Sequence, residues 1–207
     1  MAELQAFFNA VLNGDDATVG AWLAESPAVA QMKFDGATAL HCAALENRRA
    51  VVDLLLAHGA DLNVVDDEFG STPLRWANEK GHVEMTAYLA ARGAAVDFHT
   101  AAACGMVERV ANYLLAGADI NEQKGFGTPL HEACVWGHLE VVALLIAHAA
   151  DLNLKNRAKH TPLLVAAHQV ASNAGDTPIV HDERRKEIIA GCKQVVSLLR
   201  KHGALME

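Results

Sequence analysis

The stretch at residues 128–138, TPLHEACVWGH, decides the fold because near copies of it recur along the chain. The copies begin at Thr38 (TALHCAALENR), at Thr72 (TPLRWANEKGH) and at Thr161 (TPLLVAAHQV). Thr72 follows Thr38 by 34 residues, and Thr161 follows Thr128 by 33. A fixed period of this length is typical of stacked repeats, in which pairs of helices share one continuous core.

A second landmark alternates with the first. It reads HGADLN at 58–63, GADIN at 117–121 and AADLN at 149–153, with shorter forms at 92–94 and 202–204. Together the two landmarks resemble the ankyrin repeat, and the resemblance covers nearly the whole chain. It implies an all-α solenoid of about six stacked helix-turn-helix repeats with short β-hairpin fingers. The alanine-rich helices resemble those of stand-alone bacterial ankyrin proteins more than those of eukaryotic scaffolds.

One repeat shows why these residues should form two helices. Thr72 is a good N-cap, and Pro73 stands at the first helical position, where its missing N–H costs nothing. Gly81 provides the turn between the helices, and Gly93 ends the second helix as a left-handed cap. At the equivalent cap of another repeat stands Ala149, and the sequence leaves open whether it is strained or the cap relaxes.

The repeat spacing predicts a single domain over residues 1–207. Gly93 and Gly117 are only 24 residues apart, so we expect this repeat to lack its finger and to start its first helix after an N-cap at Asp97. The predicted segments are a cap repeat at 1–34, repeats at 35–65 and 66–96, the fingerless repeat at 97–120, a repeat at 121–153 and a C-terminal repeat at 154–207.

The C-terminal repeat contains an insertion at about 169–187. From Ala149 to Gly203 is 54 residues, about 21 more than one period. We expect the first helix of this repeat to run to about Ala174, a loop over 175–181 and a last helix over 182–201. Because the insertion lies in the final repeat, we interpret it as a cap.

The charge distribution bounds the partners. The chain has 17 basic and 25 acidic side chains, a net charge of -8. Residues 1–150 hold 8 of the basic and 19 of the acidic side chains, so most of the molecule is acidic. An acidic body repels phosphate backbones, which argues against nucleic acid and favours a partner protein with a basic patch.

The remaining composition predicts a soluble cytoplasmic monomer. No run of about 18 apolar residues is present, so we expect no membrane span, and no secretory signal is visible. The four cysteines have no CxxC spacing, and we interpret them as reduced structural thiols; they are Cys42, Cys104, Cys134 and Cys192.

Catalytic and metal-binding patterns are absent from the sequence. Seven of the eleven histidines occupy positions that the repeat explains, and the others have no paired ligand spacing. We find no GxSxG, P-loop or GxGxxG signature, so we predict no enzyme, no cofactor and no metal. One alternative stays open: a small-molecule or metal sensor that uses the notch left by the missing finger and the insertion, with His160, His168 and His181 nearby.

The ankyrin resemblance implies that a partner lies against the concave face, which is built from finger tips and first helices. Variable positions before the inter-helix glycine hold Glu79 and Lys80 in one repeat and Val135 and Trp136 in another. We expect Trp136 to be substantially exposed and to act as a hot spot, the alternative being that it packs on the neighbouring first helix.

Other candidate contacts lie beside these positions. Glu132 indicates that the border of the concave face is partly wet, whereas for the equivalent Trp76, next to Arg75, we favour core packing. The tips of two fingers carry aromatic residues that either anchor a partner within an acidic rim or fold back; these tip residues are Asp67, Glu68, Phe69 and Phe126. The last finger, 155–160, is basic, and we expect a solvated turn there.

The predicted function is therefore non-catalytic recognition of another protein by rigid-body docking. A regulator that occludes a basic enzyme or toxin is an alternative.

Overall fold

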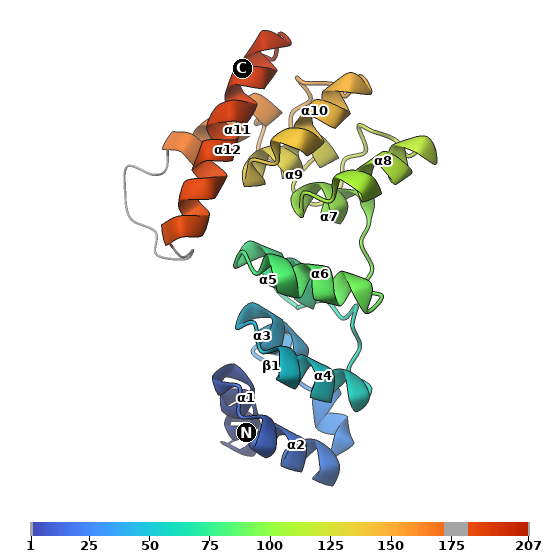
Figure 1. The fold of residues 1–207 in the computed structure, drawn as a ribbon, viewed down its shortest axis with the longest axis vertical. Helices are drawn as coiled ribbons and strands as arrows, with labels where there is room; N and C mark the ends of the chain where they lie inside the picture. Colours follow the sequence, from blue (N-terminus) through green and yellow to red (C-terminus); the bar gives the residue numbers. More distant parts are fainter. Residues whose placement is uncertain (1, 172–181, 207) are drawn as a thin grey trace. The chain divides into compact units, whose positions relative to one another are not determined.

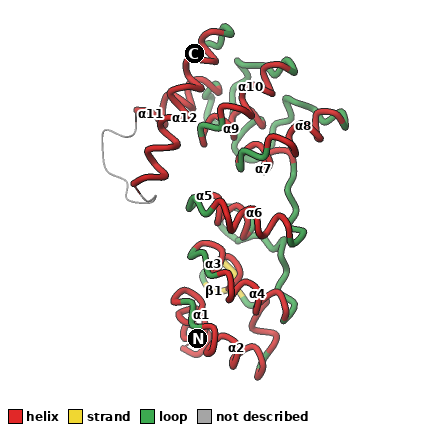
Figure 2. The backbone as a smooth tube through the Cα atoms, in the orientation of Figure 1, coloured by secondary structure: helices red, strands yellow, loops and turns green. Residues whose placement is uncertain are grey.

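The computed structural model describes residues 2–171 and 182–206, and within them the chain forms twelve α-helices (Figures 1 and 2). These residues cluster into two compact units, unit 1 (Met1–Ala95) and unit 2 (Val96–Glu207). The predicted all-α repeat fold is confirmed, since helix pairs follow one another along the chain in both units. The division into one domain of six repeats stays a prediction.

Unit 1 stacks three helix pairs. The first helices of the three pairs lie in one row, with α3 in contact with both α1 and α5. The elements are α1 (Ala2–Asn13), α2 (Asp16–Glu25), the 3-10 helix η1 (Pro27–Gln31), β1 (Lys33–Phe34), β2 (Ala37–Thr38), α3 (Ala39–Leu45), α4 (Arg49–Ala57), α5 (Pro73–Glu79) and α6 (Val83–Ala91). The core between the helices contains the fully buried side chains of Phe7, Val11, Leu23, Leu40, Leu55, Leu74 and Leu89.

Unit 2 repeats the arrangement, with α9 in contact with α7 on one side and α11 on the other. Its helices are α7 (Phe98–Ala103), α8 (Val107–Leu115), α9 (Pro129–Trp136), α10 (Leu139–Ala147), α11 (Pro162–Ala171) and α12 (Asp182–Lys201). Fully buried side chains again fill the core: Val110, Leu130, Val141, Leu145, Leu163 and Leu199.

Helix α12 has the bounds that the sequence predicts, and it packs against α9, α10 and α11. At its closest approach the backbone of Gly191 lies against the backbone of Gly137, at the end of α9. A Cβ atom on Gly137 would come within 2.7 Å of the Cys192 nitrogen and of the Ile188 oxygen. The predicted extension of α11 to Ala174 and the loop over 175–181 lie outside the described residues.

Two further backbone expectations are settled. The side chain of Asp97 accepts a hydrogen bond from the Thr100 amide at 2.7 Å, which confirms the predicted N-cap of α7. The cap at Ala149 is not relaxed: Ala149 has φ 63°, a left-handed conformation in which an alanine is strained.

Only one of the described fingers contains a pair of β-strands. Strands β1 and β2 pair antiparallel, whereas the finger at 122–127 has the single bridge between Lys124 and Gly127. In the other two fingers a backbone hydrogen bond closes a turn, from Asp66 N to Ser71 O at 2.9 Å and from Asn156 N to His160 O at 3.0 Å.

Histidines link successive repeats. The Nε2 atom of His41 lies 3.0 Å from the Ser71 carbonyl oxygen, and that of His131 lies 3.0 Å from the His160 carbonyl oxygen. The Nδ1 atoms accept hydrogen bonds from the Thr38 and Thr128 amides, so Nε2 carries the proton and donates. His99, which the repeat pattern does not explain, has the same role, with Nε2 3.0 Å from the Glu122 carbonyl oxygen.

Candidate protein-binding site

A buried carboxylate shapes the finger at residues 64–71 of unit 1. Asp66 Oδ1 accepts hydrogen bonds from the Glu68 amide at 3.0 Å and the Phe69 amide at 2.6 Å. Its Oδ2 accepts from the Ser71 amide at 2.9 Å and from Trp76 Nε1 at 3.0 Å. Burial acts to raise the pKa of Asp66, but these hydrogen bonds outweigh it, and the net pKa is lowered. The finger is therefore held in one conformation by an ionised group.

A neighbouring finger supports this one. Lys33 pairs with Asp67 and donates a hydrogen bond to the Val65 carbonyl oxygen at 2.9 Å. The Asp67 amide donates to the Gly36 carbonyl oxygen at 3.0 Å. The two finger tips of unit 1 are thus joined by side-chain and backbone contacts.

The tip presents an aromatic side chain to solvent. Phe69 is 74% exposed, and Glu68 beside it is also exposed. Phe126, the other candidate anchor, is 43% exposed and turns its ring edge toward His131, with ring centroids 6.5 Å apart. The sequence left both alternatives open for the two residues. The structure separates them: Phe69 points outward, and Phe126 partly folds back.

The first helix behind the finger is more covered than its tip. Trp76 is half-buried, and its ring lies against that of His41 with centroids 5.0 Å apart and an angle of 65° between the ring planes. On the same helix Arg75 is half-buried and Glu79 is exposed, and Lys80 at its C-cap is half-buried. We define the finger surface of unit 1 as the tips 33–37 and 64–71 together with the α5 residues that are not buried, Arg75, Trp76 and Glu79.

Two expectations for unit 2 are wrong. Glu132 is only 4% exposed, not partly wet, because α9 is covered by α7 and α11 on its two sides. Trp136 is half-buried rather than substantially exposed, as is Val135. Helix α12 packs on the end of α9, where Gly137 follows Trp136 directly.

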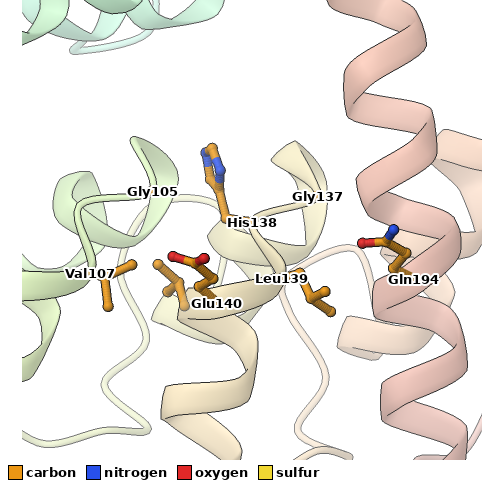
Figure 3. Close-up of a pocket in the computed structure, with 8 residues that line it drawn as sticks. Gly105, Val107, Gly137, His138, Leu139, Glu140 and Gln194 are labelled. Carbon is orange, nitrogen blue, oxygen red and sulfur yellow. The ribbon is translucent and has the colours of Figure 1, made fainter.

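A depression of about 330 Å³ lies where the α7–α8 and α9–α10 turns meet α12 (Figure 3). Its polar side chains are His138, Glu140 and Gln194. The His138 ring is already engaged, with Nε2 3.0 Å from the Ala103 carbonyl oxygen, and it points away from the Glu140 carboxylate in Figure 3. The His138 ring therefore links two successive repeats.

The groups that the sensor alternative would use are incomplete in the part of the chain that the structure describes. His160 and His168 meet edge to face with ring centroids 4.9 Å apart, and His181 lies outside the described residues. Over residues 2–171 and 182–206, no cluster of three or more His, Cys, Asp or Glu side chains has the arrangement of a metal site.

Burial suppresses the reactivity of three of the thiols. None of the four cysteines forms a disulfide, and burial raises the pKa of Cys42 and of Cys192 to about 11. Burial also raises the pKa of Cys134, which is fully buried beside Cys192. Since the thiolate is the nucleophile, none of these three thiols is activated.

Among the described residues, no helix is long and apolar enough to cross a membrane.

The chain matches the family profile described as "Ankyrin repeats (3 copies)" twice, over residues 7–100 and 98–180. The chain belongs to the ankyrin repeat family. Ankyrin repeats form protein–protein interaction modules, and proteins of this family are in general non-enzymatic adaptors. The ankyrin stack therefore makes the finger surface, rather than the depression, the candidate site.

Several curated relatives share the repeats. The mouse (Mus musculus) B-cell lymphoma 3 protein homolog is 34% identical over 134 residues, which is 64% of this chain and 25% of that protein. The human (Homo sapiens) ankyrin repeat and SOCS box protein 16 is 29% identical over 194 residues, 84% of this chain and 38% of its own length. A Drosophila melanogaster palmitoyltransferase is 35% identical over 79 residues, 38% of this chain and 12% of its own.

This ankyrin chain therefore spans at most about two fifths of these relatives. The similarity lies in the repeats they have in common, including those of the palmitoyltransferase.

Proposed function

We propose that this ankyrin protein binds another protein through the finger surface of unit 1, with Phe69 as the hydrophobic anchor, and that it catalyses no reaction. One observation carries the proposal: a 74% exposed aromatic ring on a turn that four hydrogen bonds to Asp66 hold in place. A preformed anchor loses little conformational entropy on binding, so most of its buried area contributes to affinity.

The rim of this surface defines the partner chemistry. Asp67 is already paired with Lys33, whereas Glu68 is exposed and its side chain makes no hydrogen bond or ion pair with any described residue. An apolar pocket with a basic residue at its edge is complementary to Phe69 and Glu68. A regulator that occludes a basic enzyme or toxin falls within this partner class.

Further contacts would come from the first helices. On α5, Arg75, Trp76 and Glu79 lie beside the finger, with Lys80 at the end of the helix. In unit 2 the half-buried Val135 and Trp136 and the tip residue Phe126 are secondary candidates. Glu132 is too buried to meet a partner.

The test is crosslinked capture from source-cell extract, with the captured protein identified and its affinity then measured. We expect Phe69→Ala to weaken binding about tenfold or more, because a hot-spot aromatic contributes at least that much. Leu115→Ala is the matched control: Leu115 is 82% exposed but lies at the end of α8, not on a finger. Equal loss in both variants, or none in Phe69→Ala, would contradict the assignment of the anchor.

Salt distinguishes the kind of partner. If a basic rim meets Glu68, Glu68→Gln should weaken binding at low salt and have little effect at about 0.5 M salt, where exposed charges are screened. An affinity that does not change with salt would contradict a basic residue at the edge of the partner's pocket, but it would not contradict Phe69 as the anchor.

A further inference from the structure

We propose a second protein-binding site on the finger at residues 155–160 of unit 2, which we name the basic finger, and we infer that it takes an acidic segment of a partner protein. Three cations lie within five residues there: Lys155, Arg157 and Lys159. All three are exposed, and their side chains make no ion pair or hydrogen bond with any residue that the structure describes.

The lysines of the other fingers behave differently. Lys33 pairs with Asp67, and Lys124 pairs with Asp97. In both cases the cation serves the scaffold, since it ties a finger to another part of its own unit. Among the residues that the structure describes, no carboxylate pairs with the basic finger, so its three like charges repel one another unless a partner supplies carboxylates.

The backbone of the basic finger is fixed in advance. Asn156 is 5% exposed, and its Oδ1 accepts hydrogen bonds from the Ala158 and His160 amides, each at 3.0 Å. Gln123 of the neighbouring finger donates a hydrogen bond to the Lys155 carbonyl oxygen at 3.3 Å. The three cations therefore project from a turn whose shape is set before any ligand arrives, which lowers the entropic cost of binding.

One of the cations stands at a strained position. Lys159 has φ 63°, two residues before the repeat threonine Thr161. At the same position two of the other three fingers have Gly36 and Gly70, with φ 80° and 64°, and the third has Phe126. Glycine adopts a left-handed conformation freely, whereas a lysine is strained there by about 1 kcal/mol. The chain thus has a charged side chain where two of its other fingers have glycine, and strain of this kind is found at functional sites.

Carboxylates of a protein fit this finger better than a nucleic acid does. Arg157 offers a planar donor pair that matches a carboxylate, and the lysines add point charges on either side of it. A nucleic acid would extend beyond three cations and meet a chain of net charge -8. The basic finger lies in unit 2 and would bind an acidic segment, whereas the finger surface of unit 1 would bind a partner with a basic residue. Each of the two assignments can therefore fail without the other.

The experiment uses defined probes on the full chain. Fluorescence anisotropy would compare a labelled glutamate-rich peptide with a lysine-rich peptide of equal length and a single-stranded RNA. We expect the acidic peptide to bind the wild-type protein, and the triple variant K155E/R157E/K159E to weaken it at least about tenfold. The neutral variant K155Q/R157Q should fall between them, and circular dichroism would confirm that all variants fold.

The matched control reverses charges in the other unit. D67K/E68K changes two exposed finger residues of unit 1 and should not weaken the binding of the acidic peptide. Three outcomes would overturn the proposal: an unchanged affinity in the triple variant, RNA binding tighter than the acidic peptide, or wild-type binding no tighter than about 1 mM. Capture through Phe69 would be unaffected by any of them.

Discussion

Ala149 is the residue at which local strain is most simply tested. Its φ of 63° is left-handed, and the equivalent caps Gly59, Gly93 and Gly117 are glycines. Ala149→Gly should therefore raise the free energy of unfolding by about 0.5–1 kcal/mol, measured by urea denaturation. Ala143→Gly on the exposed side of α10 is the control and should lower it by a similar amount. Loss of stability in both variants would show that the strain is relieved elsewhere.

Asp66 and Trp76 form the pair that sets the finger conformation. Asp66→Asn places an amide group among four hydrogen-bond donors, so we expect a loss of about 1–3 kcal/mol in the free energy of unfolding. Trp76→Phe removes one of the donors. The double-mutant cycle should give a coupling energy of about 1 kcal/mol or more. Additive losses would mean that the indole nitrogen does not bond Asp66 in solution.

At the scale of elements, the contact between α9 and α12 depends on two glycines. A Cβ atom on Gly191 would meet the carbonyl group of Gly137, and backbone atoms cannot move aside cheaply. Gly191→Ala should therefore destabilise unit 2 by about 2 kcal/mol or more, although alanine is the better helix former. Gly20→Ala in α2 is the matched control: no atom lies within 4 Å of its added methyl group, so stability should rise by about 1 kcal/mol.

The helices themselves were predictable because their signals are local. The cap of α7 at Asp97 and the bounds of α12 follow from residues within or next to each helix. The exposure of the site residues was not predictable, since it depends on distant segments. Glu132 is buried in a helix that has neighbouring first helices on two sides, and Trp136 ends a helix against which α12 packs through a glycine 55 residues later. Phe69 is exposed on a turn that hydrogen bonds to Asp66 hold in shape, and no sequence periodicity indicates these bonds.

At the scale of the whole molecule, the histidine links between repeats make stability depend on pH. His41 and His131 are fully buried, and burial lowers the pKa of each below the ordinary value of 6.5. Each has Nε2 donating to the next finger and Nδ1 accepting from a threonine amide, so only the neutral ring fits. The unfolded chain, in contrast, takes up a proton on both rings near pH 6.5.

The sign follows from this difference. Below pH about 6.5 the unfolded state binds more protons than the folded state does. The stability that the two neutral histidines contribute is therefore complete above this pH. It is lost as the pH falls below it, by about 1 kcal/mol per pH unit for each histidine. Urea denaturation at pH about 7.5 and 5.5 measures the loss. In H41Q/H131Q we expect lower stability at the higher pH but a flatter dependence. The carboxylate of Asp97 does not interfere: its pKa is lowered from 3.8 to about 2 in the folded protein, so the stability that it contributes is lost only as the pH falls below about 5. An equal slope in the double variant would assign the pH dependence to other groups.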